Sequence, residues 1–163
     1  MNRHTEAVTH VEFSDDSAKI LTVSGMISLR AGNGDKTARL WDLNSGKQVS
    51  KIDCMQGIRA AAISPNGKLA LLGSGEVLRI LSDDIKGSRH QRFILRISSG
   101  QTLLVAHNID LAPKIQPLRT GDTVEFYGEY EWNNKGGVVH WTHRDPNRKH
   151  IDGWLLHDGK RYE

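Results

Sequence analysis

Three histidines, two aspartates and two tryptophans lie within the fifteen residues from His140 to Trp154. Imidazole and carboxylate side chains hold metal ions or transfer protons near neutral pH. Tryptophan is large enough to shield such a site from water. This segment therefore predicts a functional site, but its composition does not name a reaction.

Four side chains in this segment could coordinate Zn²⁺ or another first-row divalent metal: His140, His143, Asp145 and His150. Positions three apart point to opposite faces of a strand, so the first two histidines converge only if the strand ends near residue 142. Two other roles remain open. The same side chains could cap turns and pack in a loop, or transfer protons without a metal. The sequence does not decide whether the chain is an enzyme or which cofactor it holds.

A second group of residues could line a ligand-binding face. Arginines and a histidine follow Gly87 and Ser88, a combination suited to an anion, and a further histidine ends an apolar strand. The predicted ligand-binding residues are Arg89, His90, Arg92, His107, Trp132 and Trp141.

Two functions from different classes fit these residues. The leading hypothesis is a β-barrel binding module with a face of histidine and tryptophan. The alternative is a metal-dependent hydrolase of the nuclease or phosphodiesterase type. In that enzyme the histidines and Asp145 would hold a metal that activates water, while Arg89 and Arg92 would neutralise phosphate.

Composition narrows the class of protein. The 163 residues are 37% hydrophobic and 25% charged, which is ordinary for a globular chain. Lys and Arg number 22 against 19 Asp and Glu and are interleaved with them, so charge gives little support to a nucleic-acid partner. No secretory signal or membrane span is visible, and we expect a soluble cytoplasmic protein. The single cysteine, Cys54, is expected to be a small buried residue.

The second half of the chain predicts a small all-β barrel. Strand-like segments occupy residues 77–81, 91–97, 101–106, 123–132 and 138–142, with hairpin turns at 98–100 and 133–137. Residues 108–121 interrupt the series after the third strand and have room for one short helix. Five strands with this interruption are typical of an OB-type barrel, although a small SH3-like barrel also remains open.

The first half predicts strands and a repeat. Residues 8–17 are echoed by residues 58–67, at an offset of 50. Between them, residues 34–47 contain Asp-Lys-Thr followed by Trp-Asp and resemble the WD-repeat family, which implies a four-stranded blade that presents a surface to a protein partner. A propeller needs four to eight blades and this chain carries fewer than two. We therefore predict an incomplete WD-like segment at 1–74 and a barrel domain at 75–163.

The second half also resembles a bacterial family known as domain of unknown function 3465, from residue 77 to residue 162. The residues that carry this resemblance are 86–94, 104–113 and 128–133, His140 to His143, Asp145, Pro146, His150, Gly153 and Trp154. The resemblance implies no activity, and the ligand stays unknown.

Overall fold

The computed structural model describes residues 4–24, 35–53, 58–64, 66–97 and 100–163, and every regular element in these ranges is a β-strand. Cys54, residue 34 of the WD-like motif, residue 65 of the repeat and residues 98–99 of the predicted turn lie outside them. The described residues contain no helix that could cross a membrane. The prediction of an all-β chain is confirmed, and the short helix expected at 108–121 is wrong, because that segment forms turns and bends.

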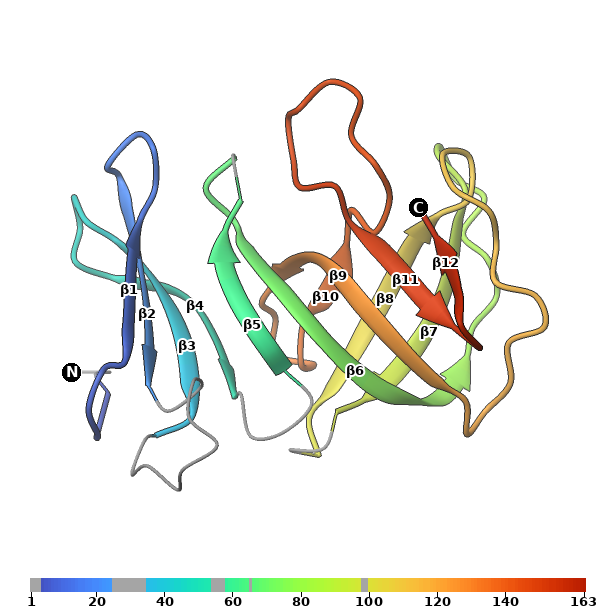
Figure 1. The fold of residues 1–163 in the computed structure, drawn as a ribbon, viewed down its shortest axis with the longest axis horizontal. Coiled ribbons are helices and arrows are strands. Elements are labelled where there is room, and N and C mark those ends of the chain that lie inside the picture. The colour runs from blue at the N-terminus through green and yellow to red at the C-terminus, as the bar shows by residue number, and fades with distance from the viewer. Residues whose placement is uncertain (1–3, 25–34, 54–57, 65, 98–99) are drawn as a thin grey trace.

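The first four strands form an antiparallel meander in chain order (Figure 1). They are β1 (His10–Phe13), β2 (Lys19–Ser24), β3 (Thr37–Asp42) and β4 (Gln48–Asp53). The inner face of this sheet buries Leu21, Leu40 and Ile52. These side chains belong to the same apolar cluster as Leu69 and Leu71 of the barrel, so the two sheets share one core.

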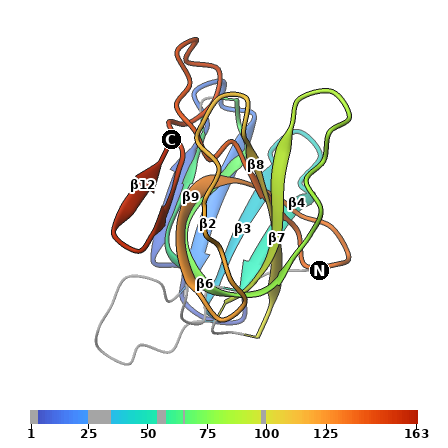
Figure 2. The same ribbon diagram turned by 90° about the vertical axis from the view of Figure 1, so that its right-hand side faces the viewer.

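Five strands close into a barrel, as predicted (Figure 2). They are β6 (Leu69–Ile80), β7 (His90–Arg96), β8 (Thr102–Asn108), β9 (Thr123–Glu131) and β10 (Val138–His140). They pair in the order β6-β7-β8-β10-β9-β6; the β8–β10 pair is parallel and the other four are antiparallel. Alternate residues such as Phe93, Val105 and Phe126 are fully buried, as expected for strands that line a small interior.

Three further strands extend the barrel wall. β5 (Ile58–Ile63) pairs with the first half of β6, while β11 (Trp154–His157) pairs with β9 and with β12 (Lys160–Tyr162). The sequence did not predict β4, β11 or β12, because these strands carry few apolar residues or are only three or four residues long.

Strand β6 runs without a break through Gly73, Ser74 and Gly75, where the sequence predicts a turn. A Cβ on Gly75 would lie 2.9 Å from the backbone oxygen of Arg96, so this glycine permits the close approach of β7. The boundary predicted between residues 74 and 75 falls inside this strand, whose residues 69–76 all pair with β9.

The repeat at an offset of 50 is also a repeat of structure. In the β1–β2 turn, the Ser14 amide donates to the Lys19 carbonyl (3.0 Å) and the Lys19 amide to Ser14 Oγ (2.8 Å). In the β5–β6 turn, the Ser64 amide donates to the Lys68 carbonyl (2.9 Å) and the Lys68 amide to Ser64 Oγ (3.1 Å). Each serine hydroxyl also bonds an Asx side chain two residues on. The two hairpins therefore place Lys19 and Lys68 in equivalent positions.

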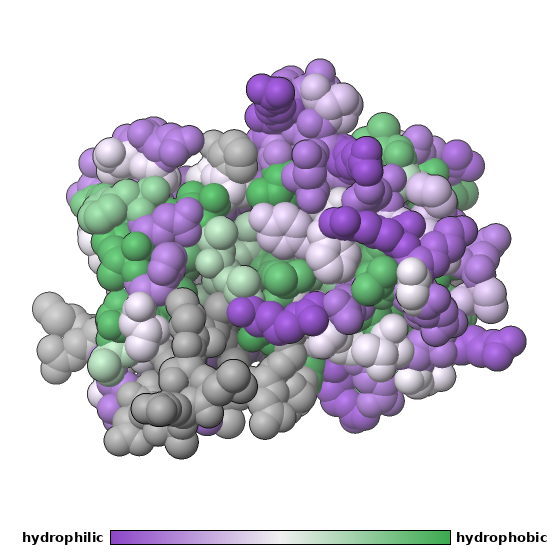
Figure 3. Space-filling view, viewed as in Figure 1, coloured by the Kyte–Doolittle hydropathy of each residue, from purple (hydrophilic) through white to green (hydrophobic). Residues whose placement is uncertain are grey.

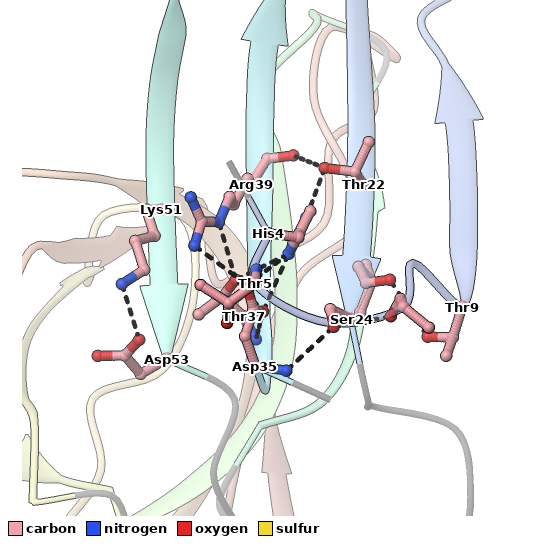
Figure 4. Close-up of polar contacts among 12 residues, drawn as sticks. His4, Thr5, Thr9, Thr22, Ser24, Asp35, Thr37, Arg39, Lys51 and Asp53 are labelled. Atoms are coloured by element: carbon pink, nitrogen blue, oxygen red, sulfur yellow. Dashed lines mark hydrogen bonds and ion pairs between the residues drawn. The ribbon is translucent and has the colours of Figure 1, made fainter. Parts of the chain in front are cut away.

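A polar network ties the strands of the first sheet together (Figure 4). His4 joins Asp35 through Nδ1 (2.9 Å) and Thr22 through Nε2 (2.8 Å), and Trp41 Nε1 donates to the same threonine hydroxyl (2.7 Å). Burial raises the pKa of Asp35, but hydrogen bonds from His4, Thr37 and the Thr5 amide outweigh this effect and hold it at about 2. The network therefore surrounds a charged carboxylate.

Candidate functional site

The residues from Trp141 to Gly153 form a loop that connects β10 to β11, and both of these strands pair with β9. His140 pairs with Glu129 of β9, and Trp154 pairs with Tyr127, so the two ends of the loop are separated on β9 only by Gly128. A Cβ on Gly153 would lie 2.0 Å from the carbonyl oxygen of Trp141. A glycine is therefore needed where the two ends of the loop meet.

Aromatic rings stack inside this loop. The ring of Trp141 lies 4.3 Å from that of His150 and 5.8 Å from that of His143, and the two imidazoles meet edge to face at 5.0 Å. Trp141 has a φ of 54°, a left-handed conformation that costs a bulky residue about 1–3 kcal/mol. The surrounding contacts hold this strained residue with 37% of its surface exposed.

Asp145 organises the backbone of the loop. Its carboxylate accepts hydrogen bonds from the amides of Asn147 (2.8 Å), His150 (2.7 Å) and Lys149. Burial acts to raise the pKa of Asp145, but these amide bonds lower it below its usual value. The turn-forming role, one of the alternatives open from the sequence, is the one that this geometry supports.

The two imidazoles of the loop are fixed by backbone carbonyls. His143 Nδ1 lies 2.8 Å from the carbonyl oxygen of Arg144, and His150 Nδ1 lies 2.7 Å from that of Ile151. A carbonyl only accepts, so Nδ1 carries the proton and, in the neutral ring, Nε2 is an acceptor. Burial lowers the pKa of His143, which favours this neutral form.

A pocket of about 350 Å³ opens beside the stacked rings. Its wall combines loop residues with Leu111 from the β8–β9 connection and Asn66 from the β5–β6 turn; the loop residues are Trp141, His143, Arg144, Asp145, Pro146, Asn147, Lys149 and His150. Hydrophilic residues cover the loop at the top of the molecule (Figure 3). The pocket is therefore lined by the indole of Trp141, the imidazoles of His143 and His150, and the cations Arg144 and Lys149.

The four predicted metal ligands are not gathered into one coordination site. No group of three or more His, Cys, Asp or Glu side chains in the described ranges could hold a metal ion. His140 faces Glu131, with 3.7 Å between Nε2 and Oε2, while the carboxylate of Asp145 is occupied by amides. The metal and hydrolase hypotheses stay sequence-based predictions, and this geometry adds no support to them.

The predicted arginines already have partners outside the pocket. Arg89 Nε lies 2.6 Å from Asp110 Oδ1, and Arg92 donates from Nε (3.1 Å) and Nη2 (3.0 Å) to the Ser82 carbonyl. His90 Nδ1 lies 2.8 Å from the Ser88 carbonyl. None of these three predicted residues lines the pocket.

His107, which the sequence placed on the ligand-binding face, lies in the core and lines neither pocket. Its side chain is completely buried; Nε2 lies 3.1 Å from the Pro113 carbonyl, and Nδ1 lies 2.8 Å from Thr142 Oγ1. Nε2 therefore donates to the carbonyl, and Nδ1 accepts from the threonine. Burial lowers the pKa of His107 to about 4, so the ring is neutral at pH 7. Through its bond with Thr142, this histidine supports the start of the loop from the core.

Trp132 is separate from the loop pocket. It is 55% exposed and lines a second pocket, where the first sheet meets the barrel. Of the six predicted ligand residues, Trp141 thus lines the loop pocket, Trp132 lines the second pocket, and the other four line neither.

Sequence reasoning missed Asn66, Leu111 and Thr142. Asn66 belongs to the repeat turn and donates from Nδ2 to Oε2 of the buried Glu129 (3.0 Å), and only the closure of β6 on β9 brings it near the loop. The site therefore depends on long-range pairing that no local pattern reveals.

Two comparisons place the chain among known proteins. A family model described as protein of unknown function (DUF3465) matches residues 53–163, a range that includes β5 and all of β6. The ribosome biogenesis protein BOP1 homolog of Drosophila virilis is 24% identical over 128 residues, which cover 74% of this chain and 15% of that protein. Because the family model matches more than half of the chain, the chain belongs to the DUF3465 family.

Proposed function

We propose that the chain is a binding module of the OB type, with its ligand site in the loop pocket. The pairing order β6-β7-β8-β10-β9, with its one parallel pair, supports the OB assignment. Barrels of this kind bind ligands through loops and one face of the wall. We also propose that the first sheet is a WD-type blade, supported by its four-strand meander and its repeated turn, and that it contacts a protein partner.

The observation that carries the proposal is the partly exposed Trp141, held in a strained conformation against His150 at the wall of the pocket. Backbone strain at a bulky residue is expected where a side chain must be held in one direction for a ligand. A flat aromatic surface of this size favours a planar ligand, because base–aromatic stacking contributes about 1–3 kcal/mol.

The polar atoms of the pocket narrow the ligand class. The neutral His143 presents Nε2 as an acceptor, so the ligand should carry hydrogen-bond donors on its edge. Lys149 lies at the rim, and Arg144, although paired with Glu163, adds a second cation. The base of a nucleotide, free or at an exposed position in a single strand, offers donors on its exocyclic amine, and the attached phosphate suits the cations Arg144 and Lys149.

The test is a titration of the full-length protein with adenosine, followed by ¹H–¹⁵N NMR. We expect shifts at the indole of Trp141 and at loop amides. Trp141→Asn should weaken binding at least tenfold, and it preserves the loop because Asn tolerates a left-handed backbone. Trp132→Ala, an exposed tryptophan outside this pocket, is the matched control and should change binding less than twofold.

Two results would overturn the nucleobase assignment. Glucose binding at the same loop without adenosine binding would give the pocket to a saccharide. Absence of shifts with both compounds at millimolar concentration would remove the proposed site altogether.

A further inference from the structure

We propose a second binding site, for a phosphate-type oxyanion, between the first sheet and the barrel. It is built from Lys19, Ser50 and Lys68 in a pocket of about 220 Å³ that both sheets line. This pocket is distinct from the loop pocket, and no residue that the structure describes lines both.

The repeat supplies the two ammonium groups. Lys19 and Lys68 occupy equivalent positions in the β1–β2 and β5–β6 turns, and the packing of one hairpin near the other brings both lysines to one pocket. The side chain of Lys19 reaches across to Gly67, where an added Cβ would lie 2.8 Å from Nζ. The glycine of the second turn therefore leaves the room that this ammonium occupies.

Neither lysine is neutralised by a close carboxylate. Within the described ranges, no ion pair of 4.0 Å or less involves Lys19 or Lys68, although the charge of Lys19 acts at longer range on Asp16 and Asp42. One carboxylate, Glu131, also lines the pocket, and its Oε2 lies 3.7 Å from His140 Nε2. The pocket thus carries a net positive charge.

Ser50 adds an observation that does not depend on the lysines. Its side chain is 8% exposed and lines this pocket, and its Oγ is enclosed without a hydrogen-bond partner in the described part of the chain. Buried polar groups nearly always have a hydrogen-bond partner, so an enclosed hydroxyl without one indicates a bound ligand that accepts its proton. An oxyanion placed between the two ammonium groups would accept the proton of this hydroxyl.

The size and lining of the pocket indicate the ligand class. Two point charges and one hydroxyl donor suit a compact tetrahedral oxyanion such as phosphate. Because the site takes one wall from each sheet, a bound anion would hold the first sheet against the barrel.

The test is a titration of the full-length protein with inorganic phosphate at low ionic strength, followed by ¹H–¹⁵N NMR. We expect saturable shifts at the amides of Ser50, Gly67 and Lys68. The double variant Lys19→Met/Lys68→Met should weaken binding at least tenfold. The control Lys47→Met/Lys135→Met removes the same charge from exposed lysines outside the pocket and should change binding less than twofold.

Ser50→Ala tests whether the Ser50 hydroxyl helps to hold the anion or whether lysine charge alone does so. It removes an enclosed hydroxyl without a partner, so the fold should be retained, while phosphate binding should weaken several-fold. The proposal is overturned if binding survives in Lys19→Met/Lys68→Met, if the control pair loses as much, if Ser50→Ala has no effect, or if the shifts appear at residues 144–149 instead. Adenosine binding at the loop is measured separately, so either site can fail without the other.

Discussion

Replacement of His107 by Gln should remove a large part of the pH dependence of stability. The ring is completely buried, and its pKa falls from 6.5 to about 4, because burial penalises the charged form. The unfolded chain therefore takes up a proton near pH 6.5, whereas the folded chain takes it up only near pH 4. The stability that the neutral ring contributes is complete above pH 6.5 and is lost as the pH falls toward 4.

The size of this loss follows from the two pKa values. One pKa unit corresponds to about 1.4 kcal/mol, so the fall from 6.5 to about 4 corresponds to roughly 3 kcal/mol of unfolding free energy. The carboxylate of Asp35, with a pKa of about 2 in the folded chain against 3.8 as its ordinary value, loses most of its stabilising effect below about pH 4 and adds little to this change. Protonation turns Nδ1 of His107 from an acceptor into a donor, so the bond with Thr142 Oγ1 must reverse, while Nε2 still donates to the Pro113 carbonyl.

The measurement is urea unfolding of wild type and His107→Gln between pH 7.5 and pH 4.5, monitored by circular dichroism. Gln can donate to a carbonyl and accept from a hydroxyl but does not titrate, so the other histidines form a common background. The stability difference between the two proteins should shrink by about 2–3 kcal/mol as the pH falls. A difference that stays constant across the range would refute the burial of a neutral ring at this position.

Three further predictions concern the fold. A chain of residues 58–163 should unfold cooperatively in urea. A chain of residues 76–163 should not, because it lacks most of the part of β6 that pairs with β9. Equal cooperativity of the two chains would contradict the closed barrel. Thr22→Val should lower the unfolding free energy by about 1–3 kcal/mol, because it removes the hydroxyl that bonds the part-buried His4 and Trp41. An unchanged melting temperature would contradict the importance of this polar network in the first sheet. Gly153→Ala should cost at least about 1–3 kcal/mol, because the added Cβ meets the Trp141 carbonyl at 2.0 Å; an unchanged melting temperature would contradict that contact.

Local patterns in the sequence predicted most of the barrel. Alternation of apolar and polar residues and glycine-rich turns placed the strands that became β7 to β10, because these signals act over a few residues. The continuity of β6 was not predicted, because Gly73, Ser74 and Gly75 resemble a turn. The reason for Gly75 lies in β7, whose backbone approaches it only after folding.

The candidate site was predicted as a cluster but not in its geometry. Trp141, His143 and His150 do come together, because they lie in one loop between β10 and β11, which both pair with β9. The inward position of His107 could have been foreseen, since Leu103 and Val105 precede it at alternate positions that face the core. The contribution of Asn66 could not, since it depends on pairing across the barrel.

Strand β6 links the stability of the two sheets. Residues 69–73 pair with β5 on one edge while pairing with β9 on the other, and Leu69 and Leu71 pack in the same cluster as Leu21 of the first sheet. Loss of the first sheet would therefore expose apolar side chains on the strand that closes the barrel. The strands at both ends of the loop that carries Trp141 also pair with β9. Loss of the β6–β9 pairing should therefore distort the loop pocket as well. The first sheet thus supports the loop pocket from a distance, since the described residues that line this pocket come from the β5–β6 turn, the β8–β9 connection and the loop.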